Sequence, residues 1–150
     1  MFYFQVGATH ERNQDYAQAE TYFEKSLQLA PNFADALNYV GYMWADRGEN
    51  LAKARDYIEK AVKLEPKNAA FLDSMGWVLY KLKQHEPALQ YLLQAVEFGE
   101  EPDATVYDHL GDVYSALKQN DKAREAWKKS LTLEPNEVIN KKLQANSTSL

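Results

Sequence analysis

The residues whose types and spacing could do chemistry are three histidines and the carboxylates that stand near them. In Asp108-His109-x2-Asp112, two carboxylates and one imidazole lie on about one helical turn, and a cation would relieve the repulsion between the carboxylates. The neighbouring sequence supplies none of the further close ligands that a stable site usually needs. We therefore predict no metal ion and no other cofactor at this segment.

Acid–base catalysis by a pair of carboxylates is the second chemical candidate. Asp73 and Asp108 stand 35 residues apart on separate predicted helices, and helix-packing distances put them about 10 Å apart with no closed pocket evident. His10 falls at a packing position and His85 at an exposed helix start, so neither completes a catalytic set. The chain has no cysteine, and each helical glycine stands alone rather than in a phosphate-binding loop. We predict that the protein is not an enzyme.

The overall charge and hydropathy exclude other classes of function. A net charge of −5 lacks the basic surface that general nucleic-acid binding needs, so we predict no nucleic-acid partner. No run approaches the roughly 18 apolar residues of a membrane-spanning helix, and the first residues lack the basic segment of a signal peptide. We expect a soluble protein without membrane insertion, in the cytoplasm or the periplasm, since a chain without cysteine suits both compartments.

The elements that position these side chains follow from evenly spaced glycines. Gly7, Gly41, Gly76 and Gly111 are separated by 34, 35 and 35 residues, each inside a stretch with apolar residues at helical spacing. A glycine inside a helix costs about 1 kcal/mol relative to alanine, so we expect a second helix to cross closely at each one. The first helices are predicted at 2–13, 34–47, 69–82 and 104–117, and the second helices at 16–29, 52–64, 86–98 and 120–133.

The residues around the glycines also repeat. The stretches that contain them are Tyr3-x2-Val6-Gly7-x2-His10, Leu37-x2-Val40-Gly41-x2-Trp44, Leu72-x2-Met75-Gly76-x2-Leu79 and Tyr107-x2-Leu110-Gly111-x2-Tyr114. The second helices carry Ala19-x3-Phe23, Ala54-x3-Ile58, Ala88-x3-Leu92 and Ala123-x3-Trp127, and three of them are followed by Pro31, Pro66 and Pro135. Over residues 1–136 this pattern resembles the tetratricopeptide repeat, a helix pair of about 34 residues.

The resemblance implies an all-α solenoid of antiparallel helix pairs that acts as a protein-interaction scaffold. We expect one domain at 1–145, with repeats at about 1–33, 34–68, 69–103 and 104–137, a capping helix at 138–145 and a flexible tail at 146–150. The stretch Ala36–Gly48 resembles copies from long bacterial tetratricopeptide proteins. We expect the chain to be the C-terminal array of a longer protein of that kind.

The capping helix should give the last repeat a polar outer face. Its apolar side chains are predicted to turn inward, and they are Val138, Ile139 and Leu143. Its polar side chains are predicted to face water, and they are Asn140, Lys141, Lys142 and Gln144.

The N-terminal end has no such cap. Its first turn and a half carries the apolar side chains of Phe2, Tyr3, Phe4 and Val6. Either a preceding part of a longer array covers them, or they bury themselves against a second molecule. The alternative function is therefore a self-association module, whose homodimer uses these four residues or an edge of the stack.

If the chain follows the family, the first helices of successive repeats line a concave face where the partner binds. The residues predicted to contact it lie about one turn from each glycine, on the face away from the second helix. They are Asn38, Tyr39, Tyr42, Asp46, Asp73, Ser74, Trp77, Tyr80, Lys81, Asp108, His109 and Asp112, with Phe4, Ala8 and Ser115 at neighbouring positions. The set is aromatic and acidic, so we expect a partner peptide or helix with basic and aromatic or apolar residues.

Two aromatic residues of this set have two open interpretations. Tyr42 and Trp77 each follow a glycine, one residue off the stripe that packs on the second helix. They either fill the space between adjacent first helices or stand partly exposed as anchors for the partner. Some family members hold a C-terminal carboxylate with basic residues on these helices. Acidic side chains occupy those places here, so we do not expect a carboxylate clamp.

Overall fold

The computed structural model describes residues 1–148, which form nine α-helices and no strand. The first helices of the predicted pairs are α1 (Phe2–Arg12), α3 (Ala34–Arg47), α5 (Ala69–Lys81) and α7 (Ala104–Ala116). The second helices are α2 (Tyr16–Leu29), α4 (Leu51–Leu64), α6 (His85–Phe98) and α8 (Asn120–Leu133), and the last helix is α9 (Glu137–Thr148). The predicted all-α fold is confirmed, and both ends of every paired helix lie within one residue of the prediction.

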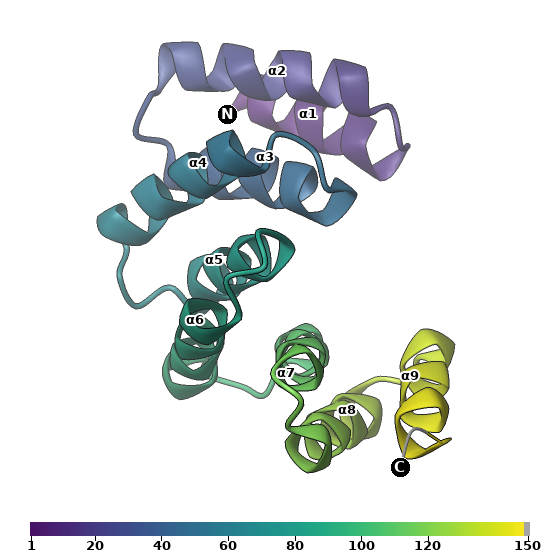
Figure 1. Cartoon of the computed structure of the whole chain (residues 1–150). Helices are drawn as coiled ribbons and strands as arrows, with labels where there is room; N and C mark the ends of the chain where they lie inside the picture. Colours follow the sequence, from purple (N-terminus) through teal and green to yellow (C-terminus); the bar gives the residue numbers. More distant parts are fainter. Residues whose placement is uncertain (149–150) are drawn as a thin grey trace. The chain divides into compact units, whose positions relative to one another are not determined.

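Each first helix packs antiparallel against its second helix, as Figure 1 shows for α1 and α2. A Cβ added at Gly76 would lie 2.6 Å from Leu92 Cγ, and one added at Gly111 would lie 2.2 Å from Trp127 Cδ1. Contacts this short leave no room for a side chain, so the expected close crossing of helices is confirmed at both positions. Burial of Leu92 and Trp127 offsets the lost helix propensity of the two glycines.

Side chains at the helix starts explain where several helices begin. Asn68 Oδ1 accepts a hydrogen bond from the Phe71 N–H at 3.2 Å, and Asp103 Oδ1 accepts one from the Thr105 N–H at 2.8 Å. Such caps satisfy N–H groups that have no partner within the helix. Pro87 lies in the first turn of α6, where its missing N–H removes no helical hydrogen bond.

Contacts within the chain divide it into two compact units. The N-terminal unit, Met1–Pro66, contains α1 to α4, and the C-terminal unit begins at Lys67 and contains α5 to α9. Each unit has its own buried apolar core, formed around Trp44 in the first and around Leu72 in the second. In the part of the chain that the structure describes, no helix combines the length and apolar composition that crossing a membrane requires.

The C-terminal helix differs from its predicted form. α9 runs to Thr148, so the predicted cap at 138–145 is too short and the predicted tail at 146–150 overlaps the helix. Residues 149–150 of that tail lie outside the described residues. Ile139 is buried as predicted, but the inward orientation predicted for Val138 is wrong, because its side chain is 62% exposed.

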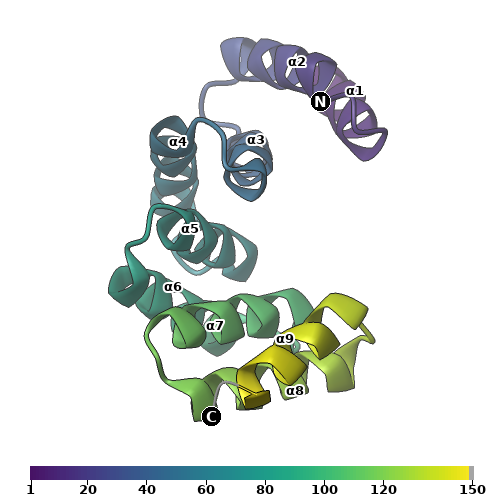
Figure 2. The same cartoon turned by 45° about the vertical axis from the view of Figure 1, so that its right-hand side comes forward.

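The start of α9 explains this difference. Asn136 Oδ1 accepts a hydrogen bond from the Val138 N–H at 2.9 Å and so fixes where the helix begins. The stripe that follows at helical spacing is Ile139, Lys142, Leu143 and Asn146, and it contacts residues of α7 and α8. Figure 2 shows α9 beside these two helices. Lys142 therefore contacts α7, and the prediction that it faces water is wrong.

Candidate functional site

Two positions on each first helix recur at a fixed distance from its glycine. They lie three residues before and one residue after the glycine, so they are four residues apart on one helical face. These residues are Asn38 and Tyr42 in α3, Asp73 and Trp77 in α5, and Asp108 and Asp112 in α7. Within one unit, we call the contact between a first helix and the next first helix a first-helix contact. α9 follows α7 in this series, so the contact between α7 and α9 is also a first-helix contact.

In the C-terminal unit, the first-helix contact between α5 and α7 is buried and polar. Asp73 Oδ1 and His109 Nδ1 form a hydrogen bond of 2.8 Å, and the Trp77 ring stacks on the His109 ring with centroids 3.9 Å apart. Trp77 is 8% exposed, and Asp73, Ser74 and His109 are buried with it. Trp77 therefore fills the space between adjacent first helices and is not an exposed anchor. An accessible partner surface made of these four side chains does not fit their burial.

The first-helix contact between α7 and α9 joins two carboxylates to a lysine. Lys142 Nζ lies 2.9 Å from Asp108 Oδ1 and 2.9 Å from Asp112 Oδ1. The Trp127 indole N–H donates a further hydrogen bond of 3.2 Å to Asp112. His109 turns to α5, so the three residues considered as metal ligands face different partners. Among the described residues, no group of three or more His, Cys, Asp or Glu side chains could hold a metal ion.

Burial and charge act in opposite directions on this cluster. Desolvation raises the pKa of Asp112, although the charge and hydrogen bond of Lys142 act to lower it. Desolvation acts to lower the pKa of Lys142, but hydrogen bonds and charge interactions with Asp108 and Asp112 together raise it. The pKa of Asp112 is therefore raised because burial outweighs the attraction of Lys142, whereas the pKa of Lys142 is raised because its two carboxylate partners outweigh burial.

Tyr80 and Lys81 extend this surface at the C-terminal end of α5. Burial raises the pKa of Tyr80, and the charge of Asp112 raises it further. The Tyr80 ring lies 5.5 Å from the His85 ring, and His85 is half-buried rather than exposed as predicted. Lys81 Nζ lies 4.9 Å from the centroid of the Trp77 ring. Tyr80 and Lys81 remain partly accessible, and their contact with a partner stays a prediction.

In the N-terminal unit, α3 keeps an accessible polar face. Asn38, Tyr42 and Asp46 are spaced four residues apart on it, and none of them is buried. The half-burial of Tyr42 leaves both of its interpretations open. The Asn38 Oδ1 atom is shielded from solvent and has no hydrogen-bond partner among the described residues. Tyr39 turns toward α1, where its hydroxyl donates to Glu11 at 3.3 Å, and burial raises its pKa.

The N-terminal aromatic residues are mostly used within their own unit. Phe4 packs against Tyr39 with ring centroids 5.5 Å apart, and Tyr3 stacks on a tyrosine of α2 at 6.2 Å. Val6 is half-buried as well. Of the four residues predicted to form a homodimer, Phe2 is the exposed one, at 70%. The surface available for self-association at this end is therefore smaller than the sequence suggests.

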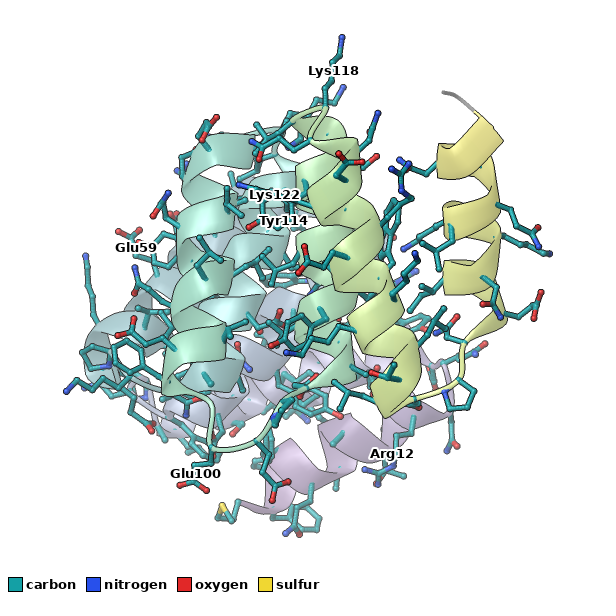
Figure 3. The ribbon with its side chains drawn as sticks, turned by 90° about the horizontal axis from the view of Figure 1, so that it is seen from below. Arg12, Glu59, Glu100, Tyr114, Lys118 and Lys122 are labelled. Atoms are coloured by element: carbon teal, nitrogen blue, oxygen red, sulfur yellow. The ribbon has the colours of Figure 1, made fainter. Side chains whose placement is uncertain are left out.

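The predicted packing role of His10 is confirmed. Its ring stacks on the Tyr22 ring of α2 with centroids 5.4 Å apart, and its Nδ1 lies 3.3 Å from Asp15. The same repeat position in α7 holds Tyr114, which lies beside Lys122 of α8 (Figure 3) at 5.8 Å from ring centroid to Nζ. This position joins a first helix to its own second helix and takes no part in the candidate site.

Lys142 is the residue of the candidate site that the sequence analysis missed. It stands seven residues after Pro135, the same distance that separates Asp73 from Pro66. This shared spacing is the signal that could have identified α9 as the equivalent of a first helix. Lysine is rarely found away from water unless it is paired, and the pairing partners of Lys142 are distant in sequence.

A comparison with protein families gives matches over most of the chain. A family model described as tetratricopeptide repeat matches residues 7–69 and 45–105. A second model with the same description matches residues 104–137. No curated protein sequence matches the chain significantly.

Several solved structures are similar over nearly the whole chain. The structure of pilF from Pseudomonas aeruginosa is 26% identical, with a TM-score of 0.81, over 98% of this chain and 67% of that one. MamA from Desulfovibrio magneticus RS-1, from residue 41 to its end, is 26% identical, with a TM-score of 0.78, over 99% and 83% of the two chains. A thermophilic tetratricopeptide protein of Thermus thermophilus, TTC0263, is 22% identical, with a TM-score of 0.86, over 98% and 80%.

Proposed function

Because the chain belongs to the tetratricopeptide repeat family, we propose that it binds a peptide or helix of a partner protein on the accessible face of α3. The family fold is a protein-interaction scaffold, and its members are generally not enzymes. The face is made of Asn38, Tyr42 and Asp46, and the observation that carries the proposal is the exposed carboxylate of Asp46, one helical turn beyond the half-buried Tyr42 ring.

The exposed Asp46 carboxylate favours a ligand with N–H groups to donate. An extended peptide, or the first turn of a helix, presents unpaired backbone N–H groups of this kind.

The neighbouring side chains add a preference for cationic residues. Tyr42 stands one helical turn beyond Asn38, and Asp46 one turn beyond Tyr42, so an aromatic ring and a carboxylate follow the amide along the helix. A lysine or arginine of the partner can contact both the ring face and the carboxylate. We therefore expect the partner segment to combine a basic residue with aromatic or apolar ones.

Selection of peptides from a display library on the full chain tests this proposal. Selected peptides should carry lysine or arginine, and Asp46→Lys should weaken their binding about tenfold or more in fluorescence anisotropy. Tyr42→Ala should also weaken binding, because it removes the aromatic ring that the basic residue contacts.

A matched control makes the same charge change on the same unit. Glu59→Lys alters a side chain of α4 that is 47% exposed, and it should leave the affinity unchanged. Equal affinity of the wild type and all three variants would place the binding surface away from α3.

The alternative function, self-association, depends on Phe2, which is 70% exposed. If a homodimer forms through this end, Phe2→Ser should convert it to a monomer in light scattering. A monomer already present in the wild type at high concentration would rule this function out.

A further inference from the structure

α7 contacts α9 through the same two repeat positions that α5 uses to contact α7. Asp108 and Asp112 of α7 form ion pairs with Lys142. They stand at the repeat positions that Asp73 and Trp77 occupy in α5. α9 therefore occupies the surface on which a further helix would be received. Figure 2 shows it lying beside α7 and over α8.

Several of the contacts that hold α9 are polar. Ile139 is its buried apolar side chain, packed in one cluster with Trp127, and Leu143 is partly buried against the same cluster. Beyond the Lys142 contacts, the Asn146 side chain accepts a hydrogen bond from Arg124 at 3.1 Å. Polar contacts of this kind are exchanged for water, or for equivalent groups of another helix, at little net cost.

The surface beside α9 is also hollowed. An open depression of about 490 Å³ is lined by residues of α5, α7, α8 and α9, and these include Tyr80, Asp112, Trp127, Lys142, Ala145 and Asn146. Ala145 is small and exposed, so a helix with a bulkier side chain at that place would bury more apolar surface there. The depression gives a competing helix a place to enter while α9 is still bound.

We propose that α9 is an intramolecular ligand that covers a receptor face on α7 and α8, and that a partner helix binds this face by displacing α9. The partner helix carries an aliphatic residue at the place of Ile139, a lysine at the place of Lys142 and a large side chain at the place of Ala145. The inference rests on the proposed function as a protein-binding scaffold, and it adds a second surface with its own regulation.

Two synthetic peptides and one variant of the full chain test the displacement. The first peptide is residues 134–150, and the second is the same peptide with Ala145→Phe. The Ile139→Asp/Lys142→Glu chain, with α9 released, should bind the first peptide about tenfold or more tightly than the wild-type chain does. The Ala145→Phe peptide should bind the released chain more tightly still, because the ring buries apolar surface in the depression.

A charge exchange checks that the peptide occupies the α7 face. For this check the chain is released by Ile139→Asp and Lys142→Ala, so that its own α9 has no charge at position 142. Adding Asp108→Lys and Asp112→Lys to it should abolish binding of the first peptide, and a peptide with Lys142→Glu should restore it. A released chain that keeps its helical circular dichroism signal but binds no better than the wild type would overturn the proposal.

Hydrogen exchange on the wild-type chain is the second measurement, and it does not depend on a variant that folds. The amides of α9 should exchange about tenfold or more faster than those of α8, since α9 opens without the rest of the unit. Equal protection of the two helices would overturn the proposal. These measurements concern α9 and its own peptide, whereas the Asp46→Lys test concerns α3, so either proposal can fail without the other.

Discussion

The two units of this protein join their successive first helices with different side chains at the same repeat positions. In the N-terminal unit, Phe4 stands three residues before its glycine and packs edge-on against Tyr39. In the C-terminal unit, the equivalent residues are Asp73 and Asp108, which bind His109 and Lys142. One first-helix contact is thus aromatic, and the other two are built from hydrogen bonds and charges.

This difference shows that the repeat pattern determines the contacts within a helix pair but not the contacts between successive first helices. The glycine and the large side chain opposite it recur in every helix pair, as with Gly76 and Leu92, because two helices cannot otherwise approach. The first-helix contact requires only that the facing side chains satisfy each other, by apolar burial or by hydrogen bonding. Polar contacts are directional, so they fix which helix is accepted, whereas aromatic contacts mainly contribute stability.

The largest effect is expected from breaking the aromatic contact. Phe4→Ala should lower the free energy of unfolding of the N-terminal unit by about 2–3 kcal/mol, since it removes a half-buried ring from a cluster that includes Phe33 and Tyr39. Urea unfolding followed by circular dichroism measures the loss. Phe2→Ala is the control, because Phe2 is exposed and its loss should change stability little. Equal effects of the two substitutions would contradict the packing described here.

The buried polar contact of the C-terminal unit should give a smaller loss. Asp73→Ala leaves the His109 Nδ1 atom without this hydrogen bond in a buried site, which should cost about 1–3 kcal/mol. Asp73→Asn keeps a side-chain oxygen at the same place and should recover most of that loss. If alanine and asparagine destabilise the unit equally, the hydrogen bond contributes nothing and packing alone holds α5 on α7.

A glycine substitution tests the close crossing of the two helices of a pair, which both units share. Gly111→Ala should destabilise the C-terminal unit by about 1–2 kcal/mol, because the Trp127 ring must move and its hydrogen bond to Asp112 is strained. The gain in helix propensity offsets part of this cost. Gly7→Ala, where the opposing atom belongs to Phe23 at 2.8 Å, should have the same sign in the N-terminal unit. A stabilising effect at either position would mean that the helices can separate without penalty.

The helix pairs could be predicted because their signals are local in sequence. The spacing of the glycines, the alanine and apolar residue of each second helix, and prolines such as Pro66 each act within one pair. Capping residues such as Asn68 then fix a helix start within a few residues. The helix ranges and the close crossings could therefore be predicted from the residues of each helix pair, without knowledge of the neighbouring pairs.

The candidate site could be predicted only in part, because access depends on the neighbouring pair. The sequence placed Asp73 and Trp77 on the correct face but could not indicate that His109, 36 residues beyond Asp73, would cover them. Lys142 was misplaced for the same reason, since its two carboxylates lie 34 and 30 residues away. Asn38 is half-buried, and its contact with a partner stays a prediction.

The smallest effect that we expect concerns the charge of Asp112, whose equivalent in the N-terminal unit is the apolar residue Ala8. Burial raises the pKa of Asp112 above its ordinary value of 3.8, so the folded state binds this proton more tightly than the unfolded state does. The stability that this proton contributes is complete below pH 3.8 and is lost as the pH rises through the higher pKa of the folded state. Asp112→Asn should therefore stabilise the C-terminal unit slightly at neutral pH, while its side-chain oxygen still accepts from Trp127. This advantage over the wild type should shrink as the pH falls toward 3.8 in urea unfolding experiments. Asp56→Asn, at a side chain that is 68% exposed, is the control and should give no such trend. An advantage of Asp112→Asn that persists unchanged at about pH 4 would show that the buried charge is not its cause.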